Sequence, residues 1–218
     1  MNFVEKNWKL LSIGFAAIII TGFVFVLMTV QSERKEKTAQ ENFASFQNQF
    51  NKMKEQQGSK DTKTVVDTVK LKNDLSDFIA KNPNTVAAQM AGILLSDILI
   101  SDKNTTEALN VLKKVQSNSS VLSNTLVFKT MGQILADTDK CQEAIEVWDK
   151  ILANKKAEFT FADIQIKQAL CYQKLNNTLK AEEILNKVKN NKTEGQEQSS
   201  LEAEKVLRLI KFNKASGT

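Results

Sequence analysis

The chain has 218 residues, among them one proline, seven glycines and no histidine, and its 30 basic and 25 acidic side chains give a formal net charge of +5. Few helix breakers and plentiful Ala, Leu, Lys, Glu and Gln favour helix throughout, over a length that suffices for one domain or an extended repeat array. Acids are interleaved with the bases, as in residues 33–37, which is typical of a solvated face rather than of a nucleic-acid or lipid site. Two cysteines exclude a disulfide-rich scaffold.

Residues 10–30 form an uncharged run of 21 residues, preceded by Trp8 and Lys9. As a helix rising about 1.5 Å per residue, the run would be about 31 Å long, close to the hydrocarbon thickness of a bilayer. The tryptophan and the lysine suit a membrane interface. A cleaved signal peptide is the alternative, but its apolar region usually has about 7–15 residues, and no A-x-A-like cleavage site follows here. The sequence therefore predicts an uncleaved transmembrane anchor.

Charge does not decide which way this helix crosses the membrane. Lys6 and Lys9 precede the run, whereas Arg34, Lys35 and Lys37 follow it. The excess of one base would place the large domain in the cytoplasm, but long domains are translocated largely regardless of charge. Both orientations stay open.

Residues 31–84 are predicted to form a helical pair next to the membrane. In its first helix, Phe43, Phe46 and Phe50 are spaced by three and four residues and so make one apolar stripe. A second helix covers about residues 62–81 and ends before Pro83. The phenylalanines either pack on the second helix or contact another membrane protein.

A repeat occupies the following part of the chain. Three segments align with each other on alanines that are 36 and 37 residues apart, namely Ala108, Ala144 and Ala181. Twelve residues before each alanine comes another small residue, and four residues after it a large apolar one: Ser96, Gly132 and Ala169, then Leu112, Trp148 and Leu185. Two small residues let paired antiparallel helices approach closely, and such pairs stack into a solenoid because one pair cannot bury its apolar side alone.

This pattern resembles the tetratricopeptide repeat, a 34-residue helical hairpin with small residues at its eighth and twentieth positions. The aromatic residue of that pattern is present only as Phe128, and the closing proline is missing from all three units. A final amphipathic stretch would cap the stack, with Leu201, Val206, Leu207 and Ile210 inward. The predicted all-α organisation is a tail (1–9), a transmembrane anchor (10–30), a juxtamembrane helical pair (31–84), about three tetratricopeptide-like repeats (85–195) and a capping helix with a tail (196–218).

The order of these parts, with Pro83, Thr85, Ala87 and Ala88 in a short turn before the repeats, resembles the YfgM type of ancillary translocon subunit. The resemblance implies a single-pass protein of a bacterial inner membrane with its repeats in the periplasm. It also implies association with the protein-export channel, with periplasmic chaperones and with newly exported chains.

No catalytic constellation is visible in the sequence. The absence of histidine removes the commonest general base and metal ligand. Carboxylate pairs such as Glu182 and Glu183 suit a solvated helix, and no glycine-rich phosphate loop occurs. We therefore expect no enzymatic activity, no cofactor, no metal, no small-molecule substrate and no nucleic-acid partner.

Cys141 and Cys171 lie almost symmetrically about a predicted turn near Lys156, so two antiparallel helices would bring them together. In an oxidising compartment they could form a disulfide that closes a loop of 31 residues. Two small buried side chains with reduced thiols are the alternative.

A binding surface is expected on the concave side of the solenoid, lined by the first helix of each repeat. The repeat phase nominates Met90, Ile93, Asp97, Leu126, Lys129, Gln133, Ile166, Leu170 and Lys174. Such a mixture suits an amphipathic segment of a partner protein, although the apolar members would equally fit a core. The predicted function is a membrane-tethered, chaperone-like interaction module at the export channel. The alternative is a scaffold or assembly factor for one folded partner, with its domain facing the cytoplasm.

Overall fold

The computed structural model describes residues 8–58, 66–117, 120–191 and 195–216, without the side chains of residues 8–17, 57–58, 213 and 215–216. Every element in this described part is helical, which confirms the predicted all-α class. In chain order the elements are α2 (Trp8–Gly58), α3 (Thr68–Lys81), α4 (Val86–Ser101), α5 (Thr105–Lys114), α6 (Val121–Asp137), α7 (Cys141–Leu152), the 3-10 helix η1 (Lys155–Thr160), α8 (Phe161–Lys174), α9 (Thr178–Asn190) and α10 (Glu197–Ser216).

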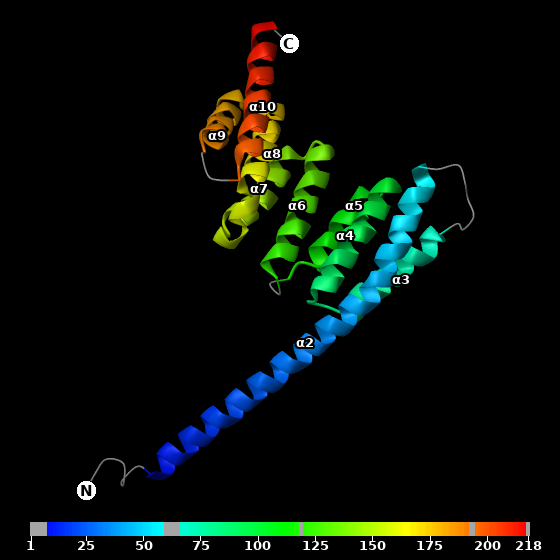
Figure 1. Cartoon of the computed structure of the whole chain (residues 1–218), viewed down its shortest axis with the longest axis vertical. Helices are drawn as coiled ribbons and strands as arrows, with labels where there is room; N and C mark the ends of the chain where they lie inside the picture. Colours follow the sequence, from blue (N-terminus) through cyan, green and yellow to red (C-terminus); the bar gives the residue numbers. More distant parts are fainter. Residues whose placement is uncertain (1–7, 59–65, 118–119, 192–194, 217–218) are drawn as a thin grey trace.

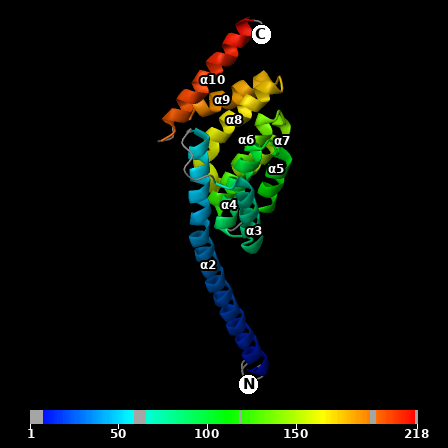
Figure 2. The same ribbon diagram turned by 90° about the vertical axis from the view of Figure 1, so that its right-hand side faces the viewer.

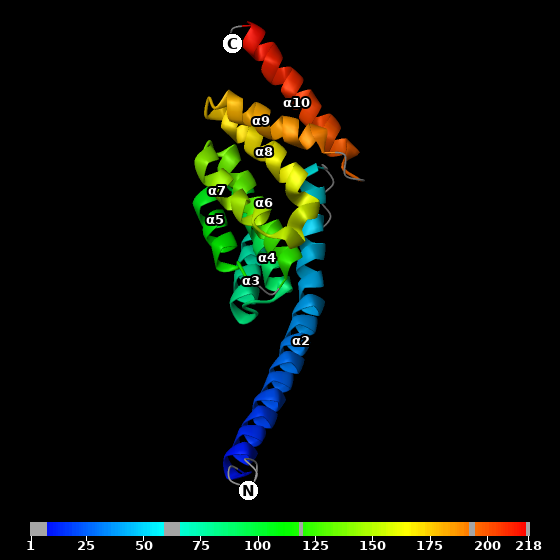
Figure 3. The ribbon, with the colours of Figure 1, turned by 90° about the vertical axis from the view of Figure 1, so that its left-hand side faces the viewer.

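Three helical hairpins follow one another along the long axis of the molecule: α4 with α5, α6 with α7, and α8 with α9 (Figures 1 and 2). Helix α10 packs on α9 at one end of the row, and α3 packs on α4 at the other end. Helix α2 lies along α4 with its C-terminal part, whereas its N-terminal part extends away from the other helices (Figure 3).

The hairpins share one turn geometry. Lys103, Asp139 and Asn176 have positive φ angles of 61°, 58° and 60°, each one residue before the residue that caps the second helix. The capping residues then donate their backbone N–H to a carbonyl five residues earlier, which closes the first helix as in a Schellman motif. These bonds are Asn104 to Leu99 (2.8 Å), Lys140 to Leu135 (2.9 Å) and Asn177 to Tyr172 (2.8 Å).

Small residues stand where the two helices of a hairpin meet. Gly132 and Ala144, one from each helix of the middle hairpin, are both buried. A Cβ added at Gly132 would overlap the indole of Trp148, and one added at Gly92 would lie 2.7 Å from Cγ2 of Val115. Gly92 stands where the tetratricopeptide pattern has an aromatic residue, and the approach of Val115 leaves no room for one.

Buried amide side chains join each hairpin to the next. Gln89 of α4 is buried, accepts a hydrogen bond from the Ser123 hydroxyl of α6 and donates to Asn124 (3.4 Å). Gln168 of α8 donates to Asp149 of α7 (2.7 Å). Because an amide without partners in the core is costly, these bonds help to fix the register between neighbouring hairpins.

Helix α2 is held to the hairpins by packing and by a cap. Phe50 is buried, and Phe43 and Phe46 lie with their ring centroids 6.5 and 5.3 Å from that of Phe78 in α3. The carboxylate of Glu36 accepts hydrogen bonds from the N–H groups of Val86 (2.9 Å) and Ala87 (3.3 Å), the first two residues of α4. The phenylalanine stripe therefore packs within the chain, and α2 covers the α4 end of the row of hairpins.

Helix α3 begins later than the periodicity predicts. Its first residue is Thr68, and the Asp67 carboxylate caps it by accepting a hydrogen bond from Lys70 N–H (3.0 Å). The predicted start near residue 62 lies outside the described residues.

The capping helix buries the predicted face except at its start: Leu207 and Ile210 are buried and Val206 is partly buried, as expected. Ala203, Leu207 and Ile210 of α10 are buried against α9, whereas Leu201, expected on the same face, is 60% exposed. Glu204 lies between Arg208 (2.8 Å) and Lys189 of α9 (3.7 Å). The hydrogen bond from Arg208 and the charge of Lys189 hold the pKa of Glu204 below its usual value.

Among the residues whose side chains are described, no helix combines the length and the apolar character needed to cross a membrane. The predicted anchor, residues 10–30, begins in the part of α2 whose side chains lie outside the description. The backbone of α2 is helical from Trp8 onward, without a break between the predicted anchor and the packed part. The anchor therefore stays a prediction.

Replacing Gly132 by valine is expected to destabilise the middle hairpin. Trp148, which an added Cβ would overlap, is only 1% exposed, so the indole must shift within a packed core to admit a larger side chain. Overpacking of this kind costs about 1–3 kcal/mol, so Gly132→Val should lower the free energy of unfolding by this amount in chemical denaturation. Gly22→Val is the matched control, because no described atom lies within 4 Å of its added Cβ. Equal stability of the two variants would contradict the close helix contact.

Candidate functional site

The nine predicted surface residues fall on α4, α6 and α8, the first helices of the three hairpins. Asp97, Leu126, Leu170 and Lys174 are exposed, whereas Met90, Ile93, Lys129 and Gln133 are half-buried. Ile166 is only 3% exposed and lies in the core formed with α9 and α10. The structure therefore leaves eight of the nine side chains accessible to some degree.

A small pocket of about 150 Å³ lies between α6 and α8 and brings three of these residues together. Gln133, Leu170 and Lys174 line it, with Ala136, Asp137, Trp148, Lys167 and Cys171 as the other lining residues. Trp148 and Cys171 are buried, so they form an apolar base beneath a polar rim. We refer to this pocket as the α6–α8 pocket.

The lysines around the α6–α8 pocket are bound across the two hairpins. Lys129 of α6 pairs with Asp163 of α8 (2.7 Å), and Lys167 of α8 donates to Gln133 of α6 (2.9 Å). Lys174 contacts the Asp139 carboxylate and donates to the Ala136 carbonyl, both at 3.1 Å. Exposed pairs of this kind contribute at most about 1 kcal/mol each, so they favour one position of α8 relative to α6 without fixing it.

The α4 end of the predicted surface is arranged differently. Asp97 forms an ion pair with Lys54 of α2 (3.9 Å), and α2 packs along α4. Met90, Ile93 and Asp97 do not line the α6–α8 pocket. The structure thus divides the predicted surface into an α4 part next to α2 and an open α6–α8 part.

Asp163 and Lys167 belong to the open part but were missed in the sequence. Asp163 lies 37 residues after Leu126, which itself lies 36 residues after Met90. Asp163 therefore occupies the same repeat position as two predicted surface residues, and the repeat period could have identified it. On α8 the residues of the open part are Asp163, Lys167, Leu170 and Lys174, spaced by four, three and four residues. That spacing is one continuous helix face.

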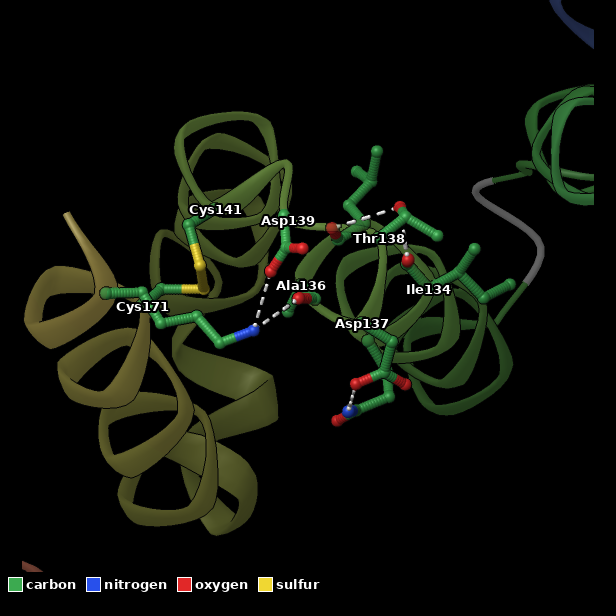
Figure 4. Close-up of polar contacts among 10 residues, drawn as sticks. Ile134, Ala136, Asp137, Thr138, Asp139, Cys141 and Cys171 are labelled. Carbon is green, nitrogen blue, oxygen red and sulfur yellow. Dashed lines mark hydrogen bonds and ion pairs between the residues drawn. A yellow bond between two sulfur atoms is a disulfide. The ribbon is translucent and has the colours of Figure 1, made fainter.

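A disulfide joins Cys141 to Cys171 at the edge of this pocket (Figure 4). The Cα atoms are 5.0 Å apart, and both side chains are buried. Cys141 is the first residue of α7 and Cys171 lies near the end of α8, so the bond connects the second hairpin to the third. Figure 4 shows Ala136 and Asp139, the two groups that bind Lys174, beside the bridge.

The groups around the α6–α8 pocket are suited to recognising a side chain of a partner. Within the described residues, no group of three or more Cys, Asp or Glu side chains is arranged to hold a metal ion. An apolar base of the size of one side chain, with amide, ammonium and carboxylate groups around it, suits an apolar residue of a partner that also offers polar groups. Leu126 and Leu170, which are 38% and 46% exposed, extend the apolar area beyond the pocket.

No protein-family model, curated protein or solved structure matches this chain.

Removing the disulfide is expected to destabilise the domain. The bridge joins residues 30 positions apart, and in the chain-entropy model closing such a loop stabilises the fold by about 3–4 kcal/mol. A Cys141→Ser, Cys171→Ser double variant should lose about this free energy of unfolding in chemical denaturation. Dithiothreitol should destabilise the wild-type chain equally and leave the variant unaffected. An unchanged wild-type midpoint in dithiothreitol would show that the bridge does not form in solution.

Proposed function

We propose that this chain is a non-enzymatic protein-interaction module held at a membrane by the N-terminal part of α2. One observation carries the proposal: between residues 18 and 30, α2 presents large apolar side chains on all its sides, and they are 40–71% exposed. This part of the helix extends away from the hairpins (Figure 3). An apolar surface of this extent is rare on proteins in water and is covered by lipid or by another protein. The side chains are Ile18, Ile19, Ile20, Phe23, Val24, Phe25, Val26, Leu27, Met28 and Val30.

The domain beyond this helix fits a tetratricopeptide-like repeat. The turn residues Asn104, Lys140 and Asn177 recur at intervals of 36 and 37 residues, the same period as the aligned alanines. The α6–α8 pocket lies on the first helices of the hairpins, the side on which repeats of this type bind partners. We propose this face as the binding surface, with an amphipathic segment of a partner protein as its ligand.

The more specific proposal is a chaperone-like subunit at a bacterial export channel, with its hairpins in the periplasm. Its support is the sequence resemblance to the YfgM type together with the bridge between Cys141 and Cys171, because disulfides persist in oxidising compartments. Exported chains and periplasmic chaperones would be the partners. The alternative, a cytoplasmic scaffold for one folded partner, is favoured by the three bases that follow the apolar run against two before it.

Protease accessibility distinguishes the two locations. Digestion of the hairpin domain after the outer layer of intact cells is opened, with the inner membrane closed, is the expected result. Protection until the inner membrane is lysed would place the domain in the cytoplasm and reject the export-channel proposal.

Aspartate substitutions on the open face test the binding surface. Leu126→Asp with Leu170→Asp places charge on the two exposed apolar residues and leaves the paired lysines in place. We expect at least a tenfold loss of affinity for reduced, carboxymethylated α-lactalbumin as an unfolded probe, because about 1–2 kcal/mol of apolar contact is lost per residue. Leu179→Asp on α9, also at an exposed leucine, is the control.

Equal affinity of the double variant and the Leu179→Asp control would exclude the α6–α8 face as the binding surface. Saturable binding of a single folded protein, without affinity for the unfolded probe, would favour the scaffold instead.

A further inference from the structure

A groove of about 720 Å³ lies where α2 passes the turn between α3 and α4. It extends from the last apolar residues of α2 to its first polar turns, and the α3–α4 turn forms the opposite wall. The lining residues are Met28, Gln31, Ser32, Glu33, Lys35, Glu36, Lys37, Gln40, Pro83, Asn84, Thr85 and Val86. One end of the groove is therefore apolar, and the rest is polar with both signs of charge.

The charged residues of this groove have different roles. Glu36 is bound to the N–H groups of Val86 and Ala87, so the N-terminus of α4 is already occupied by a carboxylate. Lys35 and Lys37 stand on either side of Glu36 and are exposed, as is Glu33. From the sequence, residues 33–37 are expected to form a solvated face, and all of them except Glu36 are exposed. The structure adds that all of them except Arg34 line the groove.

The continuity of α2 fixes the height of the groove above the apolar segment. Glu36 follows Val30 by six residues, which corresponds to about 9 Å along a helix. The polar headgroup region of a bilayer is about 5–8 Å thick on each side of the hydrocarbon core. If residues 10–30 span the membrane, the α3–α4 turn lies at the outer edge of the headgroups and the groove opens into them.

We propose that this groove binds the headgroup of a zwitterionic phospholipid with a primary amine, of the phosphatidylethanolamine class. The phosphodiester contacts the ammonium group of Lys35 or Lys37, and the amine of the lipid contacts the Glu33 carboxylate. The acyl chains follow the apolar surface of α2 beyond Met28. This inference rests on the proposed membrane anchorage, and it makes the turn that begins the hairpin array a lipid contact.

Mixed charge is the reason for choosing this class of lipid. A purely anionic headgroup would be attracted by the two lysines but repelled by Glu33 at the same groove. A choline headgroup carries no N–H donor for a carboxylate. A primary amine next to a phosphate offers a donor and an acceptor that match Glu33 and the lysines.

The full chain, reconstituted in vesicles of equal phosphatidylethanolamine and phosphatidylglycerol, tests the inference. After extraction into detergent, native mass spectrometry counts the phospholipids that stay bound. We expect the wild-type chain to retain phosphatidylethanolamine, and Lys35→Ala with Lys37→Ala to weaken retention by roughly fivefold per lysine. Lys113→Ala with Lys114→Ala on α5, which also removes two neighbouring exposed lysines, is the control and should retain lipid like the wild type.

Equal retention by the two double variants would overturn the headgroup site, as would preferential retention of phosphatidylglycerol. Loss of the bound lipid on addition of inorganic phosphate would indicate a site for a free anion instead. Flotation with the vesicles tests anchorage separately, because it depends on residues 10–30 and not on the lysines. A wild-type chain that does not float would refute the anchor itself.

Discussion

The close approach of two helices at paired small residues is the constraint on which the hairpin array depends. In the middle hairpin Gly132 has no side chain, and the indole of Trp148 occupies the space that a Cβ at this position would need. Such a contact sets the distance between the helices, and the shared turn geometry sets their angle, so each hairpin is a nearly fixed body. What remains adjustable is the position of one hairpin relative to the next.

Three kinds of interaction act on that adjustable step. Buried amides fix the register, since Gln89 and Gln168 find their partners only in one alignment of neighbouring hairpins. Exposed lysine pairs between α6 and α8 add little stability but favour one orientation. The bond between Cys141 and Cys171 is covalent and spans the same boundary. The α6–α8 pocket is therefore held in shape mainly by the connection beneath it rather than by the groups on its rim.

The helices that recur in each hairpin can be predicted from the sequence, whereas the contacts that occur only once in the chain are harder to predict. The helices of the three hairpins follow from the phase of Ala108, Ala144 and Ala181, because each copy supports the others. Two positions at the end of the array are less predictable: Ile166 lies in the core, which is the second of its two possible locations, and Leu201 is exposed instead of buried. Both depend on how α9 and α10 close the end of the array. The groove at the α3–α4 turn could not be predicted at all. It requires Glu36 to meet α4 from fifty residues away in the chain.

Continuity of α2 has a mechanical consequence. A helix that enters the hairpin domain without a hinge, and that is fastened there by Glu36 and the phenylalanines, transmits torque. In a membrane-held protein, any tilt of the apolar segment would move the hairpins by the same angle. The hairpin domain would therefore sample a narrower range of orientations above the membrane than a domain attached through a flexible linker. A partner fixed in the same membrane would then approach the α6–α8 pocket from a restricted set of directions. Less rotational freedom would be lost on binding, because the two proteins are already partly oriented relative to each other.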